Sequence, residues 1–341
     1  MEIKELQAKI KSHTLSGFYI LAGEEDYLKK HYLKEMRESV LSDDGFEIFN
    51  HVSFEGASID YAALREALYA PPMMSEYKLV EWKYASLDSL KTGELKFLLE
   101  LMEEKDSFPY SVFVILASAD GFDVSNPKRN KTYAALSEGF EIIALQKSTD
   151  AQLLAWLKKH FDAESISVDA QTLGALLFKV GHSMQMLKFE VDKLSAFLKE
   201  NGRDVLSLSD IESVCASNTE SGAFALSDAV INKNARGAFL AIDDLKSKRT
   251  DPTVIIGMLK KTYCDLVSVS LLIDEGKNAD DISSILKSHP YKTKLYISSA
   301  KKVGTKKLSD CLERLQEIDK SAKSGGISGY TAIEMFITQN L

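Results

Sequence analysis

Hydrophobic and polar positions follow two different periods in the first 145 residues. Short apolar runs with the character of buried strands cover Phe18–Ala22, Ser111–Ala117 and 140–145, and two further strand-like runs cover 46–52 and 77–82. Between them, apolar residues recur at helical spacing over 24–41, Tyr61–Tyr69 and 94–102. Strands that alternate with helices are typical of a parallel sheet. We therefore predict an α/β domain over 1–145, with helices on both faces of the sheet.

Beyond Asp150 the strand pattern disappears and only helical stripes remain. Stripes over 151–161, Ala170–Val180 and 183–199 predict a small helical domain covering 146–215. A second helical region, predicted to form a domain over 216–341, contains stripes at 223–231, 235–246, Pro252–Asp274, Ala279–Leu286, 291–302, 306–322 and 329–339. The predicted fold class is α/β plus α, in three domains.

Composition narrows the class of protein. The chain has 341 residues with 45% hydrophobic and 27% charged positions, which is ordinary for a globular protein. No apolar run approaches the roughly 18 residues of a membrane span, and the first residues lack the apolar stretch of a signal peptide. Cys215, Cys264 and Cys311 show no metal-ligand spacing. We expect a cytoplasmic protein without a membrane, disulfide or metal site.

Charge is distributed unevenly along the chain. Residues 1–145 carry 16 Lys and Arg against 25 Asp and Glu, whereas residues 216–341 carry 18 against 15. An acidic domain is a poor partner for phosphates, because like charges repel. Any contact with nucleic acid is therefore expected in the last third of the chain.

The segment after the first predicted strand is the place where a nucleotide-binding phosphate loop would lie. A phosphate loop needs GxxxxGK[ST], but the chain reads GEEDYLKK over 23–30, without the second glycine. Glu24, Glu25 and Asp26 occupy the helix amino terminus, where a triphosphate would need donors. No acidic pair, nucleophilic triad or metal cluster follows elsewhere. The sequence predicts no cofactor and no intrinsic catalysis.

An unusual corner lies between a predicted helix and a predicted strand. Pro71 and Pro72 end the helix, and Met73 and Met74 follow before the strand begins. One interpretation is a loop that folds both methionines back over the sheet. The other is a hydrophobic wedge offered to a partner, because the flexible methionine side chain suits adaptable binding surfaces.

A lysine run stands out in the last domain. Between Ile282 and Ser309 the chain has seven lysines and no Asp or Glu. The run includes Lys301, Lys302, Lys306 and Lys307. A solvated helical face, a contact with an acidic partner subunit and a weak phosphate track all remain open.

Four segments in order along the chain carry a family resemblance. They are 18–28 (FYILAGEEDYL), 72–80 (PMMSEYKLV), 181–194 (GHSMQMLKFEVDKL) and 224–230 (FALSDAV). Together they resemble the delta subunit of the bacterial DNA polymerase III clamp loader, and the resemblance spans essentially the whole chain. One departure is that methionines stand at the corner where this family usually has aromatic or leucine side chains.

The resemblance implies both a fold and a role. It implies an AAA+-like domain without a working phosphate loop, a small helical lid and a helical collar. The collar would join ATP-binding loader subunits and delta-prime in a hetero-pentamer of the DNA polymerase III holoenzyme. Pro71, Pro72, Met73 and Met74 would bind the sliding clamp and favour ring opening for loading on primed DNA, in the cytoplasmic replisome at the nucleoid.

Two other functions remain as alternatives. One is an active AAA+ ATPase of DNA metabolism, which a phosphate-loop lysine in the proper context would indicate. The other is a stand-alone helical DNA-binding protein that uses the lysine run, against which the acidic first domain argues.

Overall fold

The computed structural model describes residues 1–41, 47–324 and 328–341. The chain divides into two compact units, Met1–Ser148 and Thr149–Leu341, called here the first and second unit. The second unit contains the whole predicted collar (216–341) and all but the first three residues of the predicted lid (146–215). The boundaries between the three predicted domains stay a prediction.

The first unit is built on a five-stranded sheet whose strands are all parallel. The strand order is β2-β3-β4-β1-β5. The strands are β1 Phe18–Ala22, β2 His51–Glu55, β3 Lys78–Ala85, β4 Ser111–Ala117 and β5 Phe140–Ala144. Because β1 and β4 are buried along their whole length, they read in the sequence as nearly continuous apolar runs. β3 is also mostly buried, but it contains the charged residues Lys78, Glu81 and Lys83.

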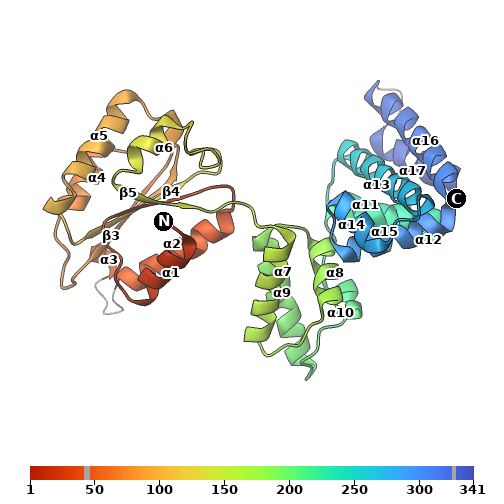
Figure 1. Cartoon of the computed structure of the whole chain (residues 1–341), viewed down its shortest axis with the longest axis horizontal. Helices are drawn as coiled ribbons and strands as arrows, with labels where there is room; N and C mark the ends of the chain where they lie inside the picture. The colour runs from red at the N-terminus through yellow and green to blue at the C-terminus, as the bar shows by residue number, and fades with distance from the viewer. Residues whose placement is uncertain (42–46, 325–327) are drawn as a thin grey trace. The chain divides into compact units, whose positions relative to one another are not determined.

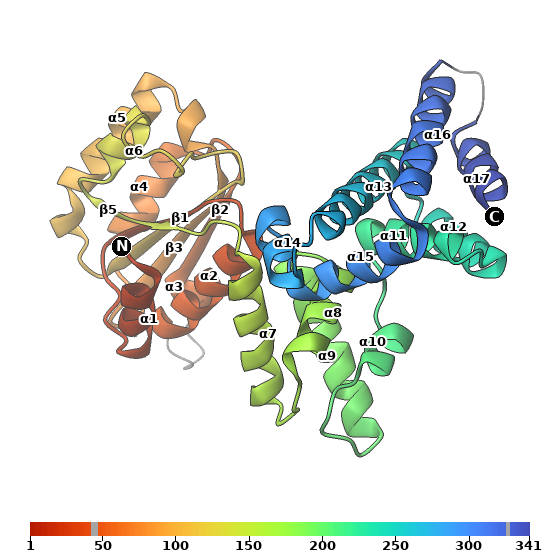
Figure 2. The same ribbon diagram turned by 45° about the vertical axis from the view of Figure 1, so that its right-hand side comes forward.

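Helices cover both faces of this sheet (Figure 1). On one face lie α1 Ile3–Lys11 and α2 Asp26–Val40, whose Leu6, Leu33 and Met36 are part of one apolar core. On the other face α4 Tyr61–Tyr69, α5 Thr92–Glu103 and α6 Lys131–Leu136 pack over a second core. Figure 2 shows the same layers from a second direction. Two short turns of 3-10 helix, Leu87–Ser89 and Lys105–Ser107, complete the unit.

One predicted strand is wrong in part. The expected strand over 46–52 is instead the four-residue helix α3 Glu47–Asn50 followed by β2, while Phe46 lies outside the described residues. A short apolar run does not distinguish a buried helical turn from a strand by periodicity alone. Two helices are not predicted from the hydrophobic pattern: α1 in the first unit and a short helix, α10 Leu208–Val214, in the second.

In the described part of the second unit the elements are helices, with one isolated parallel β-bridge between Ser167 and Val205. The first group is α7 Asp150–Ala163, α8 Ala170–Val180, α9 Met184–Glu200 and α10. The second group is α11 Thr219–Ile231, α12 Ala235–Ser247, α13 Pro252–Asp274, α14 Ala279–Leu286, α15 Pro290–Val303, α16 Thr305–Lys323 and α17 Gly329–Asn340. The second group shares one continuous apolar core. The α/β plus α fold class predicted from the sequence is confirmed.

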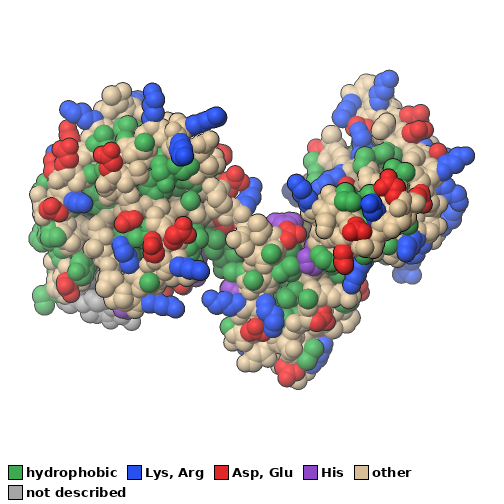
Figure 3. Space-filling model, in the orientation of Figure 1, with side chains coloured by type: hydrophobic (Ala, Val, Ile, Leu, Met, Phe, Trp, Pro, Cys, Tyr) green, Lys and Arg blue, Asp and Glu red, His purple; other side chains and the backbone are tan. Residues whose placement is uncertain are grey.

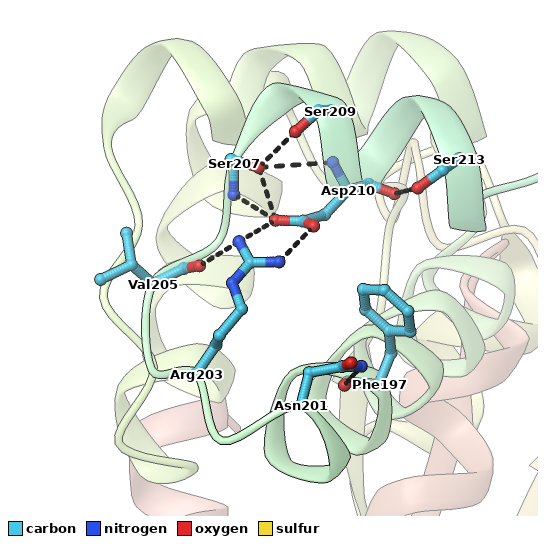
Figure 4. A network of polar contacts seen from close by, with 8 residues as sticks. All are labelled: Phe197, Asn201, Arg203, Val205, Ser207, Ser209, Asp210 and Ser213. Carbon is cyan, nitrogen blue, oxygen red and sulfur yellow. Dashed lines mark hydrogen bonds and ion pairs between the residues drawn. The ribbon is translucent and has the colours of Figure 1, made fainter.

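A polar network fixes the connection between α9 and α10 (Figure 4). The Arg203 guanidinium donates to both carboxylate oxygens of Asp210, with 2.7 Å for each hydrogen bond. Ser207 donates its backbone N–H and its hydroxyl to the same carboxylate. These hydrogen bonds, chiefly those from Arg203, hold the pKa of Asp210 well below its usual range. The network therefore starts α10 at a defined place.

Candidate functional site

At the corner after α4, side chains donate hydrogen bonds to the last carbonyl groups of the helix. Pro71 and Pro72 cannot donate to a continuing helix, so the last carbonyls of α4 need other donors. Three side chains supply them. The hydrogen bonds run from Ser111 Oγ to Leu68 O (2.7 Å), from Tyr110 OH to Tyr69 O (2.6 Å) and from Lys78 Nζ to Ala70 O (3.0 Å). The end of α4 is thus tied to the starts of β3 and β4.

Lys78 is the charged member of these donors. Its side chain is 3% exposed, and burial lowers its pKa from the usual value. A cation at the carboxyl end of a helix complements the negative end of the helix dipole. Lys78 therefore stabilises the end of α4 while the chain turns toward β3.

Both methionines of the corner are exposed. Met73 is 48% exposed and Met74 is 77% exposed, and Met74 has a positive φ of 52°. The left-handed backbone at Met74 ends any extended run from Pro72 and directs the loop into β3. The interpretation in which the loop folds both side chains back over the sheet does not match this exposure.

A second segment, α3, lies against the corner. Its contact with the corner was not predicted from the sequence. The side chain of Asn50, at the end of α3, donates from Nδ2 to Met73 O (2.8 Å) and accepts from Met73 N at Oδ1 (2.7 Å). The two preceding residues, Ile48 and Phe49, are 84% and 58% exposed. In Figure 3, hydrophobic side chains reach the surface of the first unit in the region where Figure 1 labels α3. The apolar pair at 48–49 was the available signal, but it was assigned to a strand.

Sheet topology explains why these segments meet. β2 and β3 are neighbouring parallel strands, with His51 opposite Leu79. The segments that enter them, α3 and the corner, must therefore lie side by side at the amino edge of the sheet, where the parallel strands begin. The opposite, carboxyl edge is where nucleotides bind in open α/β sheets.

At the carboxyl edge, the position of a phosphate loop is filled by the protein itself. Lys29 of α2 is 1% exposed, and its Nζ donates to Ala117 O at the end of β4 (2.9 Å) and pairs with Asp26 (2.8 Å). Gly23 has φ +114°, and a Cβ there would clash with the Leu145 carbonyl. Gly23, just before α2, and Lys29, near the start of α2, therefore both serve internal packing.

The hollow that remains at this edge is small and acidic. It has a volume of about 250 Å³, and three carboxylates, Glu24, Asp120 and Asp123, line it. Lys147 pairs with Glu24 at 2.8 Å, while burial raises the pKa of the neighbouring Glu25. Small-molecule sites usually exceed about 300 Å³ and, for phosphates, present donors. This lining offers a triphosphate little positive charge.

Between the two edges, one carboxylate is buried in the sheet. Glu81 of β3 is fully buried, and Arg37 of α2 donates to both of its oxygens at 2.8 and 2.9 Å. His51 and Lys83 place nitrogens 3.2 Å away. Burial alone would raise the pKa of Glu81, but the close contacts with His51 and Arg37 lower it to about 2. Glu81 is therefore occupied by its basic neighbours inside the protein and is not free to hold a metal ion.

The four lysines singled out in the sequence lie around the junction of α15 and α16. Lys301 and Lys302 end α15, and Lys306 and Lys307 lie in the first turn of α16; all four are exposed. Lys302 donates to Asn232 Oδ1 (2.9 Å), while the other three side chains form no hydrogen bond or ion pair within the described residues. This cluster is in the second unit and is separate from the corner.

Two further tests concern metal ions and membranes. Within the described ranges 1–41, 47–324 and 328–341, no group of three His, Cys, Asp or Glu side chains could hold a metal ion. Among the helices of the same ranges, none combines the length and apolar character that crossing a bilayer requires.

Comparisons with known proteins agree on one family. The family model of the DNA polymerase III delta subunit matches residues 19–132, and that of the delta subunit's C-terminal domain matches residues 220–340. DNA polymerase III subunit delta of Bacillus subtilis is 24% identical over 340 residues, covering 97% of this chain and 95% of its own length. A probable DNA polymerase III subunit delta of Aquifex aeolicus is 23% identical over 324 residues, covering 89% and 85%.

A solved structure supports the fold. The DNA clamp loader delta protein of Bacillus subtilis superposes with a TM-score of 0.56 at 21% identity, over 98% of both chains. Both family models describe the same subunit, and between them they match segments of both units. The resemblance stated from the sequence is thereby confirmed, and the chain belongs to the family of DNA polymerase III delta subunits, which are clamp-loader components of DNA replication.

Proposed function

We propose that this chain binds the sliding clamp through Pro71, Pro72, Met73 and Met74 and favours the opened ring. The exposure of both methionines at a corner with a fixed backbone is the observation that carries this proposal. A loop whose backbone is already fixed loses little backbone conformational freedom on binding. A partner pocket that takes both side chains gains their burial from water.

Ring opening follows from differential binding. A subunit shifts a clamp from closed to open only by as much as it binds the open form more tightly. The corner would act as a wedge if the pocket that receives it changes shape when the ring interface separates. Primed DNA then enters the ring, and the ATP-binding subunits of the loader supply the cycle that releases it.

In this role the chain itself performs no catalysis and takes no cofactor. Lys29 is committed to Ala117 O and Asp26, and the remaining hollow is lined by carboxylates. ATP hydrolysis would belong to the partner subunits of a hetero-pentamer that includes delta-prime. The complex, located in the cytoplasm at the nucleoid, would be the DNA polymerase III holoenzyme.

The wedge is tested by removing both side chains at once. Truncation of buried interface anchors costs about 2 kcal/mol each, so Met73→Ala with Met74→Ala should weaken clamp binding about 1,000-fold. Surface plasmon resonance with immobilised clamp measures the affinity, and a thermal melt checks the fold. Normal clamp affinity in a folded double variant would refute the proposed site.

The assignment of clamp binding to the first unit is tested with a fragment. Residues 1–148 form one compact unit and contain the whole corner. The fragment should bind the clamp but should not co-elute with the loader subunits, because it lacks the collar (216–341) and all but three residues of the proposed lid (146–215). Co-elution of the fragment with the loader would contradict the division of functions.

For the lysine cluster we propose a contact with an acidic neighbouring subunit. Lys306 and Lys307 lie at the amino end of α16, where the helix dipole disfavours positive charge, so they do not serve that helix. Reversing Lys301, Lys302, Lys306 and Lys307 to Glu should reduce loader assembly modestly. DNA affinity of the isolated chain should change little. Tight DNA binding by the wild type, with a steep salt dependence that the variant flattens, would instead indicate a phosphate track.

A further inference from the structure

The contact between Asn50 and the corner is a paired one. Both hydrogen-bonding ends of the Asn50 amide are used on a single residue, Met73, whose N–H and C=O they satisfy at 2.7 and 2.8 Å. Asn50 is 2% exposed, so its amide has no competing water. The side chain imitates one rung of a β-ladder and holds the Met73 backbone from the side.

This contact matters because the three donors at the end of α4 reach only the carbonyls of Leu68, Tyr69 and Ala70, which precede the four corner residues 71–74. Pro71 and Pro72 have no N–H, and Met74 has a φ of 52°, a region that L-residues with large side chains visit at a cost of about 1 kcal/mol. A conformation of this kind persists only where surrounding groups determine it. Asn50 fixes the backbone while leaving the Met73 and Met74 side chains uncovered.

The same contact brings a second pair of apolar side chains to the corner. Ile48 and Phe49 directly precede Asn50 in α3, a helix of only four residues, so the tether that holds Asn50 also holds them. Large exposed hydrophobic side chains in the described part of the first unit number six. They are Ile48, Phe49, Tyr69, Met73, Met74 and Tyr84. All but Tyr84 lie on α3, at the end of α4 or in the corner.

We infer that Asn50 is a positioning residue for the proposed clamp-binding corner, and that Ile48 and Phe49 are further contact residues on the same surface. This inference rests on the proposed function and extends it to a second chain segment. The partner is the sliding clamp, presenting apolar surface beside the pocket that receives the two methionines. Exposed Glu47 and Glu76 flank the apolar residues, as charged side chains do at the rim of an interface.

The contact role is tested with a matched pair of substitutions in the full chain. Phe49→Ser should weaken clamp binding about tenfold or more, and Ile48→Ser should act in the same direction. Phe189 on α9 is also 58% exposed but lies in the second unit, so Phe189→Ser is the control and should leave affinity unchanged. Thermal melts should show all three variants folded, because exposed positions contribute little to stability.

The positioning role needs a readout that a general loss of stability would not produce. Methyl NMR of the nine methionines should show the Met73 and Met74 signals shifted and narrowed in Asn50→Ala, with the other methionine signals unchanged. Clamp affinity should fall about tenfold. Asn50→Asp keeps the acceptor for Met73 N–H and should recover part of this loss. Asn126→Ala, at an exposed loop position, is the control.

The outcomes separate this inference from the function on which it rests. If Met73→Ala with Met74→Ala abolishes clamp binding while Phe49→Ser, Ile48→Ser and Asn50→Ala bind as the wild type does, the inference is overturned and the proposed function stands. If the double methionine variant itself binds normally, the proposed function fails, and this inference fails with it. Losses at all three positions, with unchanged binding by Phe189→Ser, support both.

Discussion

The two edges of the sheet each contain a buried lysine, and the two lysines do different things. Lys29, at the carboxyl edge, donates to Ala117 O and pairs with Asp26. Lys78, at the amino edge, donates to Ala70 O at the end of α4. Both are almost fully buried. Lys29 fills the place of a ligand, whereas Lys78 supports a loop whose own side chains remain exposed.

This difference indicates how the proposed binding surface could be supported at one edge of the sheet. At the carboxyl edge, the charge that could have met a phosphate is used to satisfy the protein's own backbone. At the amino edge, buried groups satisfy the backbone of the corner, so that Met73 and Met74 need not contribute to folding. Because the Met73 and Met74 side chains do not pack in the core, they are available to contact a partner.

The largest expected effect lies between the two edges, at Glu81. Its pKa is lowered from 4.5 to about 2 in the folded state, so its stabilisation is fully present above about pH 4.5 and is lost as the pH falls toward 2. That shift corresponds to about 3 kcal/mol. Glu81→Gln should cost about 3 kcal/mol at pH 7, because Arg37, His51 and Lys83 lose their buried partner.

Urea unfolding followed by Trp82 fluorescence measures this, in a Trp156→Phe background so that only the first unit reports. The difference between wild type and Glu81→Gln should shrink as the pH is lowered from 5 to 2. A difference that stays constant over this range would show that the carboxylate charge is not what stabilises the sheet.

The next effect distinguishes the carboxyl edge directly. Lys29→Ala removes a buried side chain and leaves Ala117 O without its donor, which should cost about 2 kcal/mol of unfolding free energy. Clamp affinity of the folded variant should not change, since the corner lies at the other edge. Lys34→Ala, at an exposed position of α2, serves as the control. If Lys29→Ala left stability intact but reduced clamp binding, the contrast between the edges would be wrong.

A smaller effect is expected from the lysine of the amino edge. Lys78→Met keeps most of the side-chain volume and removes the hydrogen bond to Ala70 O, so stability should fall by about 1 kcal/mol. Clamp affinity should fall a few-fold, because the end of α4 is no longer held. Lys96→Met, at an exposed position of α5, is the matched control. Unfolding curves and plasmon resonance on the same samples give both numbers, and an unchanged affinity would limit Lys78 to a structural role.

The smallest effect is an expected absence of binding. Glu24, Asp120 and Asp123 line the hollow at the carboxyl edge, so ATP with magnesium should give no calorimetric heat of binding. Micromolar binding of ATP that ADP competes with would contradict the contrast between the two edges, because the carboxyl edge would then be a ligand site as well.

The sequence by itself determined the layered first unit and the helical remainder. Strands β1 and β4 and helices α4, α8, α13 and α14 begin and end where their hydrophobic periodicity predicts. The location of the corner was also readable, because two prolines end a helix whatever surrounds it. The absence of the second glycine of a phosphate loop could likewise be read directly from the sequence.

Only the tertiary structure decided which segments share a surface. Asn50 and Met73 are 23 positions apart, and nothing in either local pattern links them. Their contact exists because β2 and β3 pair in parallel, which places α3 and the corner at one edge. The burial of Lys29 likewise depends on β4, 88 residues away in the chain. Periodicity reports how a segment meets its own core, whereas strand order decides which distant segments become neighbours.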